Sequence, residues 1–136
     1  MYKKNYLVTG AAGFIGSHVV DLLLERDDVE KIFVVDFLGS GSNITNLSKD
    51  PRVDLIVSDL VSHNWQDRLP RIDYILHLAA ESHVDRSIED PLAFIRSNVI
   101  GTTNVLEIAK QDGAFYPMMS SLPSPRKRLV NSSPPC

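Results

Sequence analysis

The sequence predicts an α/β protein in which a doubly wound, mainly parallel sheet of about four or five strands carries helices on its faces. Up to Gly113, short runs rich in Val, Ile and Leu alternate with stretches of helical periodicity, which is the order of βαβ units. Three equally spaced glycines, Gly10, Gly13 and Gly16, join the first apolar run to the first helical stretch. Hydrophobic residues make up 43% of the 136-residue chain, which is enough for the core of about one domain.

Four segments have the composition of strands that are buried on both faces. They are rich in β-branched and other apolar residues and cover residues 6–9, 32–36, 53–57 and 74–78. A helix is expected over residues 14–26, between the first two strands. The apolar stripe of this helix consists of Ile15, Val19, Leu22 and Leu23.

A second long helix is expected to begin at Asp90 and Pro91, because an N-cap acceptor there precedes a proline at the first helical position. It is expected to end near Gly113. Its apolar stripe, interpreted first as a core face, consists of Leu92, Ile95, Val99, Leu106 and Ala109. Gly101, inside this helix, predicts close packing or a bend, with a tolerated defect as the alternative.

The composition changes near the C-terminus, so we expect a folded unit over residues 1–116 and a tail over residues 117–136. Prolines and serines accumulate in this tail together with the basic triplet Arg126–Lys127–Arg128. We therefore expect residues 117–136 to be largely disordered, with the triplet exposed to solvent. The folded unit would then be an incomplete domain that leaves a sheet edge uncovered.

Charge and cysteine content exclude several classes of function. The formal net charge of −3 and the isoelectric point near 5.7 argue against a nucleic-acid or membrane partner. Cys136 is the only cysteine, so an intramolecular disulfide is impossible, and a reducing compartment, the cytoplasm, is expected. No apolar run approaches the ~20 residues of a membrane-spanning helix.

The three glycines suggest a binding site for a diphosphate. Gly10 suits a tight turn because it tolerates positive φ, and Gly13 lets a ligand approach the main chain. The N–H groups and the positive end of the helix that starts at Phe14 and Ile15 would then hold a pyrophosphate, and Gly16 would let this helix lie close to the sheet. The simpler alternative is a turn followed by a helix.

Asp36 gives this interpretation its second support. It lies at the end of the second predicted strand, 20 residues after Gly16, where an acidic side chain in this architecture binds an adenosine ribose. A carboxylate at that place would repel a 2′-phosphate, so NAD is expected in preference to NADP. The alternative is an exposed acid at a strand end. The two motifs together predict a Rossmann-type NAD-binding domain.

Two stretches resemble a known family. TGAAGFIG at residues 9–16 resembles the extended short-chain dehydrogenase/reductase family. HLAAESHVDRS at residues 77–87, followed by Pro91, Phe94 and NVIGTTNVLE at residues 98–107, is similar to dTDP-glucose 4,6-dehydratases. The resemblance covers roughly residues 5–113, and the second stretch is the more specific one.

The resemblance implies roles for further residues. It places Asp59 and Leu60 against the adenine and Asn43 in the loop around the ribose. Ala79 and Ala80 would lie beside the nicotinamide, where small side chains leave room at the carboxyl end of a strand. Three residues are implied to face a nucleotide sugar such as a dTDP-hexose: Ser82, Asp85 and Arg86. Ser82 and Asn98 would also lie on the cofactor side.

A zinc site is the competing interpretation of the same stretch. His77, Glu81, His83 and Asp85 carry zinc-ligating groups, but they lack the spacing of a known zinc motif. His77 alternates with apolar strand residues and is better explained as a hydrogen-bonded core histidine. We therefore expect no metal.

The chemistry implied by the resemblance is that of an NAD-dependent lyase. The sugar is oxidised at C4, water is lost across C5 and C6, and the hydride returns to C6. That reaction depends on a tyrosine four residues before a lysine, a spacing that none of the four tyrosines has. No catalytic residue is therefore assigned, and whether this chain alone is an enzyme stays open.

Three interpretations of the chain follow. The first is the NAD-binding part of a nucleotide-sugar dehydratase, expected to be inactive in isolation and to originate as a fragment, a splice product or a frameshifted end. The second is a related epimerase or decarboxylase. The third is a non-catalytic module, because the resemblance implies a homodimer through the helix at residues 91–109.

Overall fold

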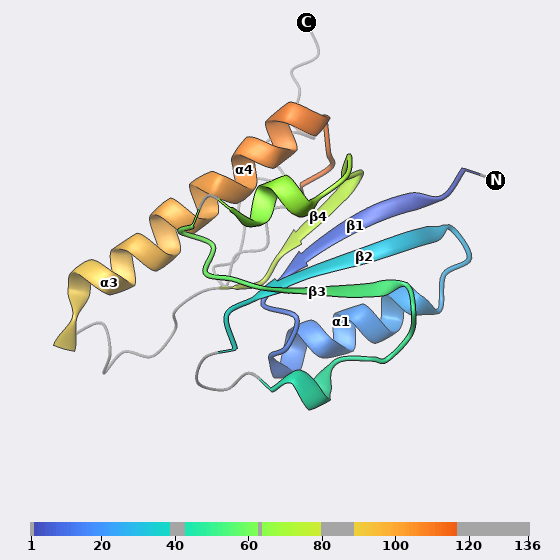
Figure 1. Ribbon diagram of the computed structural model, residues 1–136, viewed down its shortest axis with the longest axis horizontal. Coiled ribbons are helices and arrows are strands. Elements are labelled where there is room, and N and C mark those ends of the chain that lie inside the picture. Colours follow the sequence, from blue (N-terminus) through green and yellow to red (C-terminus); the bar gives the residue numbers. More distant parts are fainter. Residues whose placement is uncertain (1, 39–42, 63, 80–88, 117–136) are drawn as a thin grey trace, which may run out of the picture.

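The computed structural model describes residues 2–38, 43–62, 64–79 and 89–116, and it contains a parallel sheet of four strands in the order β3-β2-β1-β4 (Figure 1). The strands are β1 (Lys4–Thr9), β2 (Val29–Asp36), β3 (Val53–Val57) and β4 (Tyr74–His77). All four predicted strands are confirmed. β1 and β2 begin earlier than predicted because Lys4 pairs with Val29, in a segment whose charged residues hide the strand pattern.

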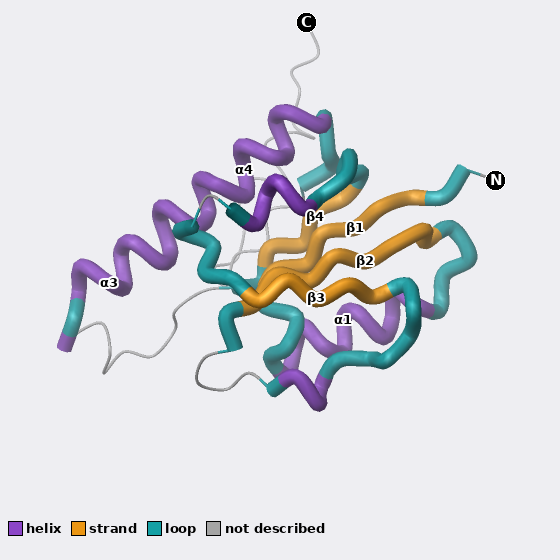
Figure 2. Tube along the Cα trace, viewed as in Figure 1, coloured by secondary structure: helices purple, strands orange, loops and turns teal. Residues whose placement is uncertain are grey.

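Helices cover both faces of the sheet (Figure 2). One face carries α1 (Phe14–Leu24), and the other carries a continuous helical segment made of α3 (Pro91–Ile95), the π-helical turn η3 (Arg96–Ile100) and α4 (Gly101–Asp112). Two short 3-10 helices, η1 (Ile44–Asn46) and η2 (Trp65–Arg68), lie in the connections. None of the described helices is long and apolar enough to cross a membrane.

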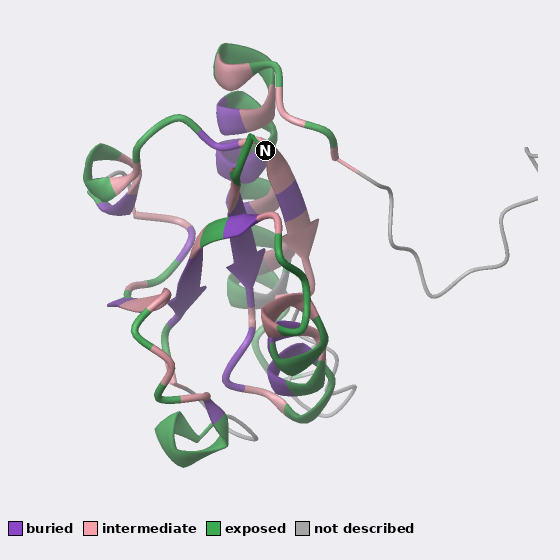
Figure 3. Cartoon of the chain, turned by 90° about the vertical axis from the view of Figure 1, so that its right-hand side faces the viewer, coloured by how far each residue is buried: buried purple, intermediate pink, exposed green. Residues whose placement is uncertain are grey.

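Alternate residues of the strands build two separate cores. Tyr6 and Val8 of β1 pack on the side of α1 with Val20, whereas Leu7 packs on the side of α4 with Val105. Side chains of a strand point alternately to the two faces, so a strand covered on both sides is apolar throughout. Figure 3 accordingly shows strands that are largely buried between helices whose outer faces are exposed.

The predicted buried stripe of α1 is wrong in two of its four residues: Ile15 is 67% exposed and Leu22 is 63% exposed, whereas Val19 and Leu23 are partly buried and Leu23 packs against the core. The fully buried residues of the helix are Gly16, Ser17 and Val20. The reason is the contact of Gly16 with the preceding turn, where a Cβ on Gly16 would lie 2.3 Å from the Gly10 carbonyl oxygen. Small residues let the helix approach the turn, and a pattern built from large apolar residues misses that face.

The ends of the C-terminal helical segment are confirmed. Asp90 Oδ1 accepts a hydrogen bond from the Ala93 N–H at 3.1 Å, and Gly113 ends α4 with a φ of +65°. The interpretation of its apolar stripe as a core face is wrong for four of its five residues, while Ala109 packs against the core. Four of its residues are exposed, namely Leu92 (72%), Ile95 (52%), Val99 (56%) and Leu106 (44%).

Two features account for the difference. α3 projects beyond the carboxyl edge of the sheet (Figure 1), so its side chains have no strand to pack against there. A π turn also holds more residues than an α turn, so a period of 3.6 cannot continue from α3 through η3 into α4. The buried face of α4 consists instead of Gly101, Asn104, Val105 and Ile108. A Cβ on Gly101 would lie 3.1 Å from Leu60 Cβ, which shows that the close-packing explanation of this glycine is correct.

The chain covers part of the outer edge of β4. After Gly113, the Phe115 N–H donates to the Asp73 carbonyl and the Ile75 N–H donates to the Phe115 carbonyl, each at 2.9 Å. Phe115 thus forms an isolated parallel bridge with Tyr74. The expected uncovered edge is therefore partly paired. The predicted tail, residues 117–136, lies outside the described residues.

Candidate functional site

The turn between β1 and α1 lies at the carboxyl end of the sheet. Gly10 has a φ of +72°, as its predicted role in the turn requires, and its N–H donates to the Val35 carbonyl at 3.0 Å. A Cβ on Gly10 would also lie 2.8 Å from the main chain of Ala79. Gly10 is therefore required for its conformation and for the close approach of the end of β4.

Gly13 is placed differently from the other two glycines. It is the N-cap of α1, and a Cβ there would meet only the Gly10 carbonyl oxygen, at 3.3 Å. Among the described residues no side chain caps α1, and Phe14 and Ile15 point outward with 77% and 67% exposure. The first turn of a helix has N–H groups without intrahelical acceptors, so this end can bind an anion.

The Asp36 carboxylate faces this turn. The side chain is almost completely buried, its Oδ2 accepts a hydrogen bond from the Ala12 N–H at 3.0 Å, and its Oδ1 accepts one from the Leu38 N–H at 2.8 Å. An ionised carboxylate has about four acceptor positions. The two hydrogen bonds therefore leave acceptor capacity beside the glycine turn.

The loop at residues 43–46 holds the glycine turn from the other side. The Ala12 carbonyl accepts hydrogen bonds from the Asn43 N–H and from Asn46 Nδ2, each at 3.0 Å. The Asn43 side chain accepts from the Thr45 N–H at 2.9 Å and thereby caps η1. Sequence analysis placed Asn43 in this loop but missed Asn46, because an asparagine in a polar loop has no distinguishing pattern.

The segment after β3 contains the two residues implied to contact adenine. Asp59 is exposed, whereas the side chain of Leu60 is buried in the core, so Leu60 can offer a ligand mainly its main chain. Asn104 Nδ2 of α4 donates to the Leu60 carbonyl at 2.7 Å and to the Val61 carbonyl at 3.3 Å. This buried amide fixes the segment, and sequence analysis missed it because the two parts are distant in the chain.

The end of β4 carries His77, which is half-buried. Its Nδ1 lies 2.6 Å from Thr9 Oγ1 and its Nε2 lies 2.9 Å from Thr102 Oγ1. Burial lowers the pKa of His77 below its usual value. The prediction of a hydrogen-bonded core histidine is confirmed, and the zinc interpretation loses one of its ligands, since both ring nitrogens already have partners.

The structure places two of the remaining implied site residues, and the other four fall in a part of the chain that it does not describe. Ala79 lies against Gly10, and Asn98 lies half-buried in η3. Four others lie outside the described residues: Ala80, Ser82, Asp85 and Arg86. The described residues contain no group of three or more potential metal ligands.

The described residues fit a dinucleotide. Main-chain donors at the start of α1, the space above Gly13 and the Asp36 carboxylate lie together at one corner of the sheet. These are the groups that a diphosphate and an adjacent ribose require. Because NAD contains both groups, the geometry at this corner favours NAD as the ligand.

Comparison with known proteins agrees with this site. The family described as GDP-mannose 4,6 dehydratase matches residues 7–133. A dTDP-glucose 4,6-dehydratase of Neisseria gonorrhoeae is 40% identical over 124 residues, which is 88% of this chain and 35% of that protein.

Solved structures of dehydratases and epimerases also resemble the chain. The chain resembles DesIV, a dTDP-glucose 4,6-dehydratase from Streptomyces venezuelae with NAD bound, with a TM-score of 0.73 and 40% identity over 81% of this chain and 37% of that one. It also resembles a UDP-N-acetylglucosamine 4-epimerase from Methanobrevibacter ruminantium, with a TM-score of 0.72 and 34% identity over 84% of this chain and 36% of that one. The chain spans about a third of the length of these proteins. The family match over nearly the whole chain shows that it belongs to the GDP-mannose 4,6 dehydratase family of Rossmann-type, NAD-binding proteins.

Proposed function

We propose that this chain is the NAD-binding part of a nucleotide-sugar 4,6-dehydratase similar to those that act on dTDP-glucose. The observation that carries the proposal is the hydrogen bond from the Ala12 N–H to the Asp36 carboxylate. It puts an acceptor for ribose hydroxyls directly beside the main-chain donors of the glycine turn. The similarity to a dehydratase with NAD bound supports the same assignment.

Each part of NAD has an assigned place in this proposal. The diphosphate lies over Gly13 against the N–H groups of Phe14, Ile15 and Gly16, where the positive end of α1 favours it. The ribose hydroxyls bind Asp36, within the loop that contains Asn43. The adenine lies along Asp59 and the main chain of Leu60. Ala79 and Ala80 border the nicotinamide, with Asn98 on the same side.

The substrate is proposed to be a dTDP-hexose, bound near Ser82, Asp85 and Arg86. NAD, when bound, supplies a hydride acceptor for C4 of the sugar and a donor for C6. The printed 136 residues contain no tyrosine with a lysine four positions later. We therefore propose that this chain by itself binds the cofactor without converting the sugar. The epimerase alternative is supported by the structural similarity to an epimerase and opposed by HLAAESHVDRS.

The test is the affinity of the full chain for NAD and NADP, measured by calorimetry. NAD should bind more tightly than NADP, and Asp36→Asn should weaken NAD about tenfold, because hydrogen bonds to a charged group are worth about 1.5–3 kcal/mol. Asp54→Asn is the control, since Asp54 lies in mid-β3 in an exposed ion pair with Lys31. Equal affinity for both dinucleotides would contradict the ribose assignment.

A second measurement tests the lack of turnover. The chain with NAD and dTDP-glucose should show no formation of a 4-keto sugar. Product formation by this chain alone would show that another group replaces the missing tyrosine and lysine.

We also propose that the chain forms a homodimer, or joins a longer relative, through the outer face of α3, η3 and α4. The observation in favour is the exposure of Leu92, Ile95, Val99 and Leu106 on that face. Several large apolar side chains exposed along one helical segment are typical of an interface, and these four residues are called the apolar row below. In this form the chain is a non-catalytic module that associates with other subunits.

A further inference from the structure

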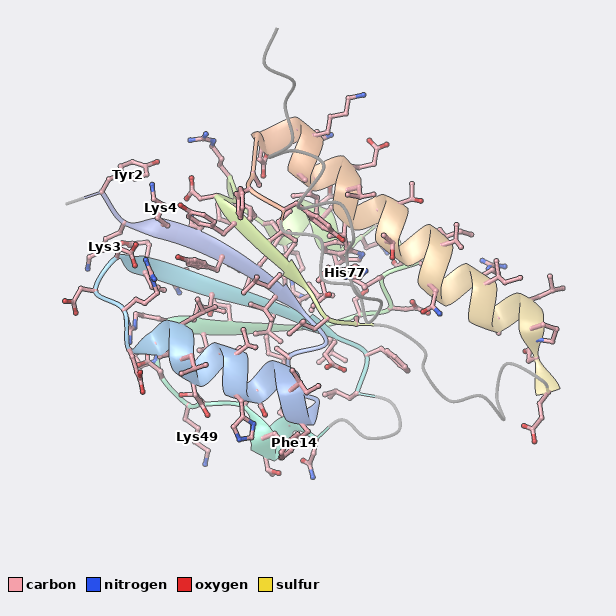
Figure 4. The ribbon with its side chains drawn as sticks, turned by 180° about the vertical axis from the view of Figure 1, so that it is seen from behind. Tyr2, Lys3, Lys4, Phe14, Lys49 and His77 are labelled. Carbon is pink, nitrogen blue, oxygen red and sulfur yellow. The ribbon has the colours of Figure 1, made fainter. Side chains whose placement is uncertain are left out.

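His77 connects three elements of the fold at the carboxyl edge of the sheet. Figure 4 labels it at the end of β4, between the sheet and the C-terminal helical segment. Its ring is held between Thr9, the last residue of β1, and Thr102, in the first turn of α4. Thr9 is completely buried, so its hydroxyl depends on protein partners.

The hydrogen bonds at Thr9 determine which ring nitrogen of His77 carries the proton. Thr9 Oγ1 accepts from the Ala79 N–H at 3.2 Å and from the Leu78 N–H at 3.1 Å, and the Leu78 N–H also donates to the Thr9 carbonyl at 3.1 Å. A hydroxyl accepts two hydrogen bonds and donates one, so the Thr9 proton points to His77 Nδ1, at 2.6 Å. Nδ1 is therefore an acceptor. The neutral ring carries its proton on Nε2, which donates to Thr102 Oγ1 at 2.9 Å.

The hydrogen bonds of the Thr9 hydroxyl connect His77 to the glycine turn through Leu78 and Ala79. Leu78 and Ala79, held by the Thr9 hydroxyl, are the first residues after β4. A Cβ on Gly10 would lie 2.8 Å from both Cα and N of Ala79, so the main chains of the two residues are in direct contact. A displacement of Ala79 must therefore move Gly10, because close-packed main-chain atoms transmit such displacements.

We infer that His77 is a positioning residue for the cofactor: as the Nε2–H tautomer it orients the Thr9 hydroxyl, which fixes Leu78 and Ala79 against the glycine turn. The inference rests on the proposed NAD site at that turn. His77 touches neither the diphosphate nor the ribose in this arrangement. It acts through Thr9.

Protonation of His77 breaks this arrangement. A proton on Nδ1 would point at a Thr9 oxygen whose acceptor positions are occupied, so the hydroxyl must release the Ala79 N–H or the Leu78 N–H, of which the Leu78 N–H keeps the Thr9 carbonyl as an acceptor. Thr9 of β1 and Thr102 of α4 carry no charge. Among the described residues the titratable group that faces His77 is Tyr116, with ring centroids 6.4 Å apart, and burial raises its pKa, which keeps it neutral.

NAD affinity should therefore decrease at low pH. Only the neutral ring supports the arrangement, so NAD affinity is constant well above the His77 pKa. That pKa lies below the usual value of 6.5. Affinity falls as the pH drops through it, by up to about tenfold per pH unit.

The experiment measures NAD affinity of the full chain by calorimetry between pH 5 and 8, in four variants. His77→Phe removes both hydrogen bonds and should weaken NAD about tenfold at neutral pH. His77→Asn keeps an acceptor at the place of Nδ1 without a titratable ring, so it should bind within about threefold of wild type and lose the pH dependence. Thr102→Val should weaken NAD about threefold.

Thr103→Val is the matched control. Thr103 is the neighbouring threonine, it is exposed, and its hydroxyl donates to the Val99 carbonyl within the same helical segment at 2.8 Å. Its substitution should leave NAD affinity unchanged. Thermal unfolding of every variant separates a loss of positioning from a loss of folded protein. A folded His77→Phe variant with wild-type affinity would overturn the inference.

A second readout needs no cofactor. The ¹⁵N shifts of the His77 ring should report a proton on Nε2, and the amide signals of Leu78 and Ala79 should shift when His77 titrates. A proton on Nδ1, or amides that do not respond, would overturn the inference. If the tautomer and the amide response are found but wild type binds no NAD, the proposed function fails while the hydrogen-bond network stands.

Discussion

At the scale of single residues, Gly13 and Gly16 show that two glycines of one motif have different physical roles. A Cβ on Gly16 would lie 2.3 Å from the Gly10 carbonyl oxygen and 2.6 Å from Ala11 Cα, both main-chain atoms that cannot move aside easily. A Cβ on Gly13 would meet only one atom, at 3.3 Å. The fold therefore needs Gly16, whereas the role proposed for Gly13 is to leave space for the ligand.

This difference predicts opposite effects of two alanine substitutions. Gly16→Ala should destabilise the chain by about 1–3 kcal/mol, because overpacking outweighs the gain of about 1 kcal/mol in helix propensity. Gly13→Ala should cost less stability, about 1 kcal/mol, because the φ of −77° suits alanine although alanine is a poorer N-cap than glycine. It should weaken NAD strongly by filling the proposed space of the diphosphate. Chemical denaturation and calorimetry measure the two effects. A stable Gly16→Ala variant would contradict the packing argument.

At the scale of elements, α4 holds the segment after β3 in place. Asn104 donates to the carbonyls of Leu60 and Val61, and Gly101 lets Leu60 approach the helix. Trp65 Nε1 adds a further hydrogen bond to the Leu60 carbonyl at 3.3 Å. The buried face of α4 thus positions the proposed adenine site.

Asn104→Leu should lower the free energy of unfolding by about 1–3 kcal/mol, because the Leu60 carbonyl loses its shorter hydrogen bond and the Val61 carbonyl loses the amide donor. It should also increase amide hydrogen exchange in residues 59–62 and weaken binding of adenosine monophosphate. Gln111→Leu, an exposed position on the same helix, should change stability by no more than about 0.5 kcal/mol. Unchanged exchange in residues 59–62 would show that Asn104 does not hold this segment.

Element boundaries were predictable wherever a local signal marks them. The cap at Asp90, the left-handed Gly113 and the β-branched runs act within a few residues, and the structure has each of them, although β1 and β2 begin earlier than predicted. The buried faces of α1 and of the C-terminal helical segment were not predictable. They depend on Gly16 and on the π turn η3, which an apolar period does not reveal.

At the scale of the whole molecule, the sheet has one helix layer on each face (Figure 1). The C-terminal helical segment exposes the apolar side chains of Leu92, Ile95, Val99 and Leu106. The chain spans about a third of the length of its relatives. Exposed apolar rows associate when two copies can cover them together.

If the apolar row drives self-association, the average molecular mass measured by light scattering should rise with protein concentration. Val99→Lys should shift the chain toward the monomer, because a buried lysine at the interface would leave an uncompensated charge. Leu22→Lys on α1, a position with 63% exposure on the opposite side of the sheet, is the control and should not change the mass. A monomer at all concentrations in wild type would contradict self-association through this surface.

The sequence by itself determined the strands, the glycine turn, the acid at the end of β2 and the two caps, because these features depend on neighbouring residues. The tertiary structure decided which helix faces are buried and which polar side chains hold the site. Thr9 and His77 are 68 positions apart, and Asn104 and Leu60 are 44 apart. Such contacts form only when strands and helices distant in the chain pack together, so no local pattern contains them.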